Sequence, residues 1–141
     1  MNSLDSRIVE FIEEHHVLTL ATVKDNIPWC SNCFYAYHKE ENIFVFTSDL
    51  DTRHAKEAME NESVAASIVL ETSVVGKIQG LQISGRVYMP DGEFLKIANK
   101  RYMKRFPFAQ LMKTNLWILE PARYKMTHNR LGFGKKLFWE K

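Results

Sequence analysis

The chain has 141 residues, of which 45% are hydrophobic and 26% are charged, and its formal net charge is +2. This length and composition predict one globular domain over residues 1–141 and exclude a disordered chain. The positive charge is too small for a general nucleic-acid-binding surface, so we expect no nucleic-acid partner. The sequence has no apolar run of transmembrane length and no signal-peptide pattern, so we expect no membrane partner and a cytoplasmic location.

The first half of the chain predicts one helix and three antiparallel strands. Apolar residues at helical spacing predict a helix over residues 3–15, with Ser3 as its N-cap. Apolar and β-branched residues then predict strands at 17–24, 28–37 and 43–47, joined by short polar turns. Three strands in succession with such turns form an antiparallel meander.

The second half predicts two helices among further strands. Helices are expected over residues 53–60, with Thr52 as N-cap, and over 93–105, ended by Pro107. Strands are expected at 64–70, at 77–89, and at 115–120 and 123–127 on either side of Pro121, followed by a basic and aromatic tail over 129–141. Gly80 and Gly85 indicate bulges or sharp curvature in the long strand. The pattern lacks βαβ alternation and predicts a mainly β fold, a six- or seven-stranded antiparallel barrel with short flanking helices.

The two cysteines form a Trp-Cys-x-x-Cys motif, Trp29 to Cys33, which is also the pattern of thioredoxin-like redox sites. That chemistry needs the first cysteine at a helix N-terminus. Here the motif lies within a predicted strand, where Cys30 and Cys33 would point to opposite faces. We therefore expect two reduced, separate thiols. A zinc site is not expected either, because a second ligand pair is missing from the sequence.

Residues at the end of the third strand and the start of the following helix could bind an anion. Thr47 and Ser48 supply hydroxyl groups, and Thr52 offers another at the helix start. The first backbone N–H groups of a helix are free to bind an anion, and Arg53 can add a forked pair of hydrogen bonds, with His54 as a further nitrogen donor. The same residues also suit an ordinary capped helix start, and local chemistry alone favours that simpler interpretation.

Four segments carry a wider resemblance, namely residues 17–22 (VLTLAT), 43–48 (IFVFTS), 52–54 (TRH) and 61–65 (NESVA). Through them the chain resembles, over nearly its whole length, the pyridoxamine 5'-phosphate oxidase-like superfamily of FMN-binding split barrels. The resemblance implies that Thr47 and the Ser/Thr-Arg-Lys run, here Thr52, Arg53 and His54, hold the FMN phosphate together with Ser48. His54 stands where the superfamily usually has lysine, and the loop needs one inserted residue.

The tail narrows this resemblance. Residues 127–134 (THNRLGFG), with Lys135 and Trp139, resemble the YhbP-like group of split-barrel proteins. The resemblance implies a homodimer with the flavin at the subunit interface, where Arg130 and Lys135 reach the flavin of the other subunit. A solvated basic tail is the alternative for both residues. Gln82 falls on the strand where oxidase relatives place a glutamine against the flavin, and Gln79 points to the opposite face.

The function implied by the resemblance is FMN binding, with NAD(P)H-linked oxidoreductase activity on a small molecule. We do not expect pyridoxamine 5'-phosphate oxidase activity itself, because the sequence lacks the fuller basic set that binds that substrate. The alternative is a haem- or flavin-binding or storage protein on the same fold, with His54 or His128 as candidate haem ligands. The catalytic residues stay unassigned, and no metal-ion site is expected.

Overall fold

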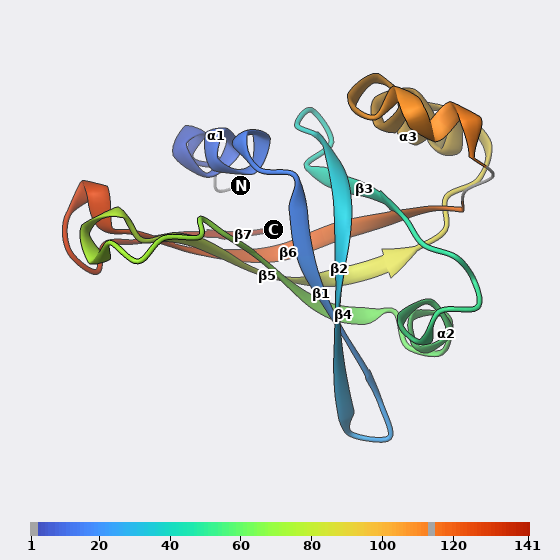
Figure 1. Cartoon of the computed structure of the whole chain (residues 1–141), viewed down its shortest axis with the longest axis horizontal. Helices are drawn as coiled ribbons and strands as arrows, with labels where there is room; N and C mark the ends of the chain where they lie inside the picture. Colours follow the sequence, from blue (N-terminus) through green and yellow to red (C-terminus); the bar gives the residue numbers. More distant parts are fainter. Residues whose placement is uncertain (1–2, 113–114) are drawn as a thin grey trace.

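The computed structural model describes residues 3–112 and 115–141, and in that part of the chain seven strands form one antiparallel sheet. The order along the sheet is β3-β2-β1-β4-β5-β6-β7, and β3 also pairs with β6, so the sheet closes on itself. The strands are β1 (Val17–Lys24), β2 (Ile27–His38), β3 (Ile43–Thr47), β4 (Ser63–Val69), β5 (Gln79–Tyr88), β6 (Leu116–His128) and β7 (Lys136–Glu140). The helices are α1 (Ser6–Glu14), α2 (Arg53–Glu60) and α3 (Gly92–Arg105), with short 3-10 turns at η1 (Val75–Lys77), η2 (Pro107–Leu111) and η3 (Asn129–Leu131). Figure 1 shows α1, α2 and α3 at separate positions around the strands.

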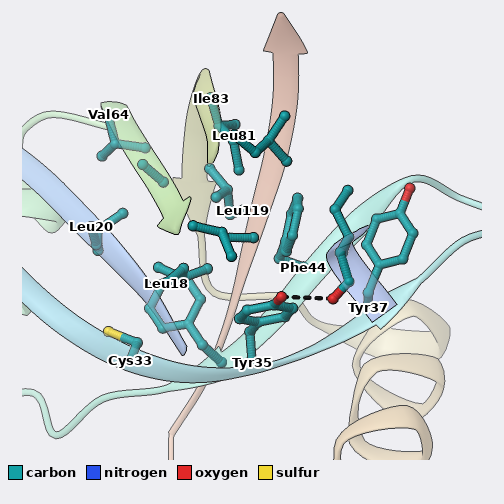
Figure 2. Close-up of a cluster of buried hydrophobic side chains, with 14 of the residues drawn as sticks. Leu18, Leu20, Cys33, Tyr35, Tyr37, Phe44, Val64, Leu81, Ile83 and Leu119 are labelled. Atoms are coloured by element: carbon teal, nitrogen blue, oxygen red, sulfur yellow. Dashed lines mark hydrogen bonds between the residues drawn. The ribbon is translucent and has the colours of Figure 1, made fainter. Parts of the chain in front are cut away.

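The main core fills the interior of this barrel. Inward residues alternate with outward ones along the strands, as in the alternating burial of β4, because successive strand residues point to opposite faces. Figure 2 shows several of the inward side chains, among them Leu18, Phe44 and Leu119. Helix α1 adds buried apolar residues to this core, and the buried Tyr35 hydroxyl donates to the Ile12 carbonyl at 2.7 Å. The interior is therefore closed partly by α1.

Strand β3 is buried on both faces, which explains its unbroken apolar sequence. Phe44 and Phe46 belong to the barrel core, whereas Ile43 and Val45 belong to a second cluster. That second cluster includes Tyr102 and Ala98 of α3, so α3 covers the outer face of β3. A strand buried on both faces needs apolar residues at successive positions.

The structure confirms the mainly β barrel with short helices. Strands β1 and β3 and helix α2 have the bounds expected from the sequence. The N-cap of α1 is Asp5 rather than Ser3, so that expectation is wrong. The Asp5 carboxylate accepts from the Arg7 backbone N–H at 2.9 Å, and its hydrogen bonds with Arg7 lower the pKa of Asp5 to about 2.

The second half of the sheet contains two further corrections. Pro121 does not divide two strands, because β6 runs without interruption from Leu116 to His128. Strand β6 pairs with β3 through residue 119 and with β7 from residue 123. Pro121 therefore lies where β6 changes partner, a position that needs no ladder donor on that side. The tail also forms a strand, β7, which pairs with β6 and completes the sheet.

Of the two glycines expected at bulges, only Gly85 lies at one. The register between β5 and β6 shifts between Ser84 and Gly85, whereas the pairing at Gly80 is regular. A Cβ atom on Gly85 would lie 2.3 Å from the Glu120 carbonyl oxygen. At Gly80 the nearest atom would be the Ile68 carbonyl oxygen at 3.7 Å, an ordinary contact.

None of the helices within residues 3–112 and 115–141 has the length and apolar character needed to cross a lipid bilayer.

We expect Gly85→Ala to lower the free energy of unfolding by about 1–3 kcal/mol, the scale of overpacking, because the backbone at Glu120 must move. Gly80→Ala is the matched control and should change stability by much less than Gly85→Ala. Chemical denaturation of both variants measures the difference. Equal effects of the two substitutions would show that the close approach of Gly85 to Glu120 does not determine the loss of stability.

Candidate functional site

The junction between β3 and α2 positions the residues expected to bind an anion. The Ser48 backbone N–H donates to the Asn115 carbonyl at 3.2 Å, which continues the β3–β6 pairing one residue past Thr47. Thr52 caps α2, since its hydroxyl accepts from the Ala55 N–H at 3.3 Å and donates to the Asp49 carbonyl at 2.8 Å. The helix start is thus fixed by its own cap and by the end of the barrel strand.

Ser48, Thr52 and His54 form a compact cluster in this junction. The Ser48 Oγ lies 2.7 Å from the His54 Nε2, and the Thr52 Oγ1 lies 3.4 Å from the same nitrogen. Because the Thr52 hydroxyl hydrogen is used on Asp49, a hydrogen on His54 Nε2 suits both contacts. The Ser48 hydroxyl can then donate to the Cys33 sulfur, with which it shares a hydrogen bond. Burial lowers the pKa of the His54 imidazole, so it is neutral at pH 7.

The side chains of Thr47 and Arg53 contact residues of other elements that lie beside the junction. The Thr47 Oγ1 lies 3.2 Å from the hydroxyl of Tyr102, which belongs to α3. The Arg53 Nε donates to the Glu57 Oε2 at 3.3 Å, and its guanidinium carbon lies 4.1 Å from the centre of the Trp29 ring. Arg53 is therefore oriented by a carboxylate and by an aromatic face, a combination suited to a planar cation.

Glu57 is the buried member of this group. It is only 4% exposed, and its Oε1 has no hydrogen-bond partner within the described residues. A buried carboxylate is costly unless it is paired, and Arg53 forms the ion pair with it. Glu57 and Arg53 are thus coupled, and the Arg53 side chain is still half exposed.

The other expected site residues lie elsewhere in the chain. Gln82 is exposed on the outer face of β5, paired with Ser67 and Lys125, whereas Gln79 is buried. Arg130 belongs to η3, and Lys135 precedes β7. Their connection between β6 and β7 lies at the opposite end of the sheet from α2 (Figure 1). Within one chain, the structure therefore groups residues 47–54 but not Gln82, Arg130 or Lys135.

The two thiols of the Trp-Cys-x-x-Cys motif diverge as expected. Both lie in β2, with Cys30 exposed and Cys33 buried. Burial raises the pKa of the Cys33 thiol, which is the opposite of an activated redox cysteine. In the described residues no three His, Cys, Asp or Glu side chains are grouped to hold a metal ion.

Four residues around the junction were missed by the sequence analysis. Glu57 and Lys56 follow Arg53 at the i+4 and i+3 positions of α2, so helical spacing could have identified both. Trp29 and Tyr102 come from β2 and α3. No local pattern connects them with Arg53 or Thr47, and only the folded chain brings them near.

Comparison with known proteins identifies the class. The family model described as pyridoxamine 5'-phosphate oxidase matches residues 4–127, and the chain therefore belongs to the pyridoxamine 5'-phosphate oxidase family. A UPF0306 protein of Photorhabdus laumondii is 40% identical over 134 residues, which are 95% of this chain and 94% of that protein. This relative belongs to the YhbP-like group, so the narrower resemblance drawn from the tail is confirmed as well.

Solved structures with the same fold have different ligands in their descriptions. A haem-binding protein from Mycobacterium smegmatis has a TM-score of 0.79 at 16% identity, over 99% of this chain and 60% of that one. An FAD-binding protein from Mesorhizobium loti has a TM-score of 0.70 at 14% identity, over 87% of this chain and 92% of that one. At these identities the likeness shows the fold alone. The chain covers only about three fifths of the length of the Mycobacterium protein.

The lowered pKa of His54 predicts a pH dependence of stability. The unfolded chain binds more protons than the folded one between the folded pKa of His54 and the ordinary value near 6.5. The free energy of unfolding is therefore fully retained above that window and falls as the pH drops through it. Denaturant titrations from about pH 7.5 to about pH 5 should show a shallower fall for His54→Gln than for the native protein.

Part of the fall that remains in His54→Gln is expected from His16, an exposed histidine whose pKa is also lowered, by partial desolvation and by the nearby charges of Arg105 and His15. Identical pH profiles for the native protein and the variant would contradict a buried, neutral His54.

Proposed function

We propose that this protein binds FMN, with the phosphate at the β3–α2 junction, and acts in the cytoplasm as an NAD(P)H-linked oxidoreductase on a small molecule. The observation that carries the proposal is the guanidinium of Arg53, held at the start of α2 by Glu57 and Trp29. Membership of the pyridoxamine 5'-phosphate oxidase family and the FAD-binding neighbour support a flavin as the ligand.

The residues of the junction suit a phosphate group. The two terminal nitrogens of Arg53 can form a forked pair of hydrogen bonds with phosphate oxygens, and the first N–H groups of α2 add further donors. Ser48 shares hydrogen bonds with His54 and with the Cys33 thiol, so its part is to fix the end of β3. Thr52 is occupied by its cap, so its part is to fix the helix start. When bound, the flavin supplies the hydride and electron transfer.

We propose further that the functional unit is a homodimer with the flavin at its interface. The outer face of β1, β4 and β5 supports this, because the residues at its centre are small and uncharged: Thr19, Ala21, Ala65, Ser67 and Ser84. A second copy on that face could bring its Gln82, Arg130 and Lys135 to the site that these residues do not reach within one chain. The pyridoxamine 5'-phosphate oxidase reaction itself is not proposed.

A haem is the alternative ligand, supported by the description of the Mycobacterium neighbour. His54 is poorly suited as an axial ligand, because its Nε2 lies 2.7 Å from the Ser48 hydroxyl. His128 is the other candidate: its Nδ1 has no hydrogen-bond partner among the described residues, but it is buried, so the surrounding chain must open before it can bind an iron. An absorbance spectrum of the purified protein distinguishes the two ligands, because bound FMN gives flavin bands and bound haem gives a Soret band.

Arg53→Ala should weaken FMN binding by about 1.5–3 kcal/mol, the scale of a lost hydrogen bond to a charged group. Binding of riboflavin, which lacks the phosphate, should be unchanged in the same variant. Quenching of flavin fluorescence measures both affinities. An equal loss for FMN and riboflavin would show that Arg53 supports the site as a whole rather than the phosphate.

With FMN bound, and with dissolved oxygen or added free FMN as the electron acceptor that reoxidises the bound flavin, the protein should consume NADH or NADPH, and the rate should depend on the FMN concentration. Arg53→Ala should need more FMN for the same rate, because the substitution weakens cofactor binding and leaves the flavin chemistry unchanged. Loss of absorbance by the reduced nicotinamide measures the rate. Tight FMN binding without any turnover of either nucleotide would favour flavin storage over catalysis.

A further inference from the structure

Beside the junction, a surface pocket of about 480 Å³ lies between the turn that joins β1 to β2 and the first turn of α2. Its lining includes the cationic side chains of Lys24, Arg53 and Lys56. It also includes carboxylates, of which Asp25 and Asp51 are exposed to solvent and Glu57 is buried. His54 is not among the described residues that line it.

Arg53 enters this pocket with its position fixed and its terminal nitrogens free. Its Nε donates to the Glu57 Oε2, and its guanidinium lies over Trp29. Within residues 3–112 and 115–141 its two terminal nitrogens donate no hydrogen bond. Because Glu57 is buried with its second oxygen unpartnered, releasing Arg53 would leave an unpaired buried charge. The forked end of Arg53 is therefore held ready for a ligand.

Lys56 lies three residues after Arg53 in α2, on the same side of the helix as the pocket. Its ammonium forms no ion pair within the described residues. Lys24 contributes less, because its Nζ lies 3.1 Å from Glu60. His54, which stands where the superfamily usually has lysine, directs its Nε2 to Ser48 at 2.7 Å.

We propose that Lys56 is the second cation of the phosphate site, acting with Arg53 in place of the residue at position 54. This inference rests on the proposed function. A phosphate monoester carries about 1.5–2 negative charges at pH 7. Glu57 already offsets part of the Arg53 charge, so a second cation on the same helix face is needed, and Lys56 supplies it. Glu57 and Trp29 are the positioning residues that orient Arg53. A cation next to Arg53 in the sequence, at position 54, is thus replaced by Lys56, which is next to Arg53 on the helix surface.

The test compares Lys56→Gln, His54→Gln and Lys39→Gln in the full chain, each checked for folding by circular dichroism. Lys39 is an exposed lysine in the turn between β2 and β3 and serves as the matched control. Fluorescence titrations should show FMN affinity about tenfold weaker in Lys56→Gln, the scale of one charge-assisted hydrogen bond. Lys39→Gln should match the native protein, and His54→Gln should lose less than Lys56→Gln. Riboflavin should bind all four proteins alike.

Salt provides a second measurement. The dependence of FMN affinity on salt concentration should be weaker in Lys56→Gln than in the native protein, because a cation of the site has been removed. FMN binding that is unchanged in Lys56→Gln and lost in His54→Gln would overturn the inference and leave the proposed function standing.

A titration with inorganic phosphate tests the role of Lys56 independently of the proposed FMN binding. Broadening of the phosphate ³¹P resonance by the native protein, absent with Lys56→Gln, would support the cation pair even if FMN itself does not bind. Failure of the native protein to bind FMN would then reject the proposed function alone. Equal broadening by the native protein and Lys56→Gln would reject the cation pair.

Discussion

The backbone pairing of β3 with β6 is the constraint on which the rest of this structure depends. It closes the seven-stranded sheet, and the hydrogen bond from Ser48 to Asn115 extends it to the residue where the chain leaves the barrel. The position of α2, and with it that of Arg53, follows from that exit point. The same closure buries β3 on both faces, which requires its unbroken apolar sequence and the cover provided by α3.

The sequence predicted the local elements well where hydrophobic pattern and caps agree. Thr52 marks the start of α2, and the apolar run of β3 identifies that strand with its bounds. The prediction from sequence failed for segments whose structure depends on pairing with residues distant in the chain. Pro121 suggests a break, but β6 changes partner there and needs no donor on that side. The basic tail has no clear strand pattern, and it becomes β7 because β6 offers a free edge.

The candidate site likewise contains residues that the sequence could identify and residues that only the folded chain brings together. The residues from Thr47 to His54 are near one another because they are near in sequence, and the resemblance identified them before the fold was known. Helical spacing could also have identified Glu57 and Lys56. Trp29 reaches Arg53 only because the β1–β2 hairpin lies beside α2. The separation of Gln82, Arg130 and Lys135 from α2 is a property of the closed sheet, and the proposed second copy would bridge it.

The most direct test of a flavin phosphate at the β3–α2 junction is a crystal structure of the protein grown with FMN. The account predicts the phosphate at the start of α2, within hydrogen-bond distance of Arg53 and of the first N–H groups of the helix. A phosphate bound at any other element, or crystals without FMN at a saturating concentration, would contradict it.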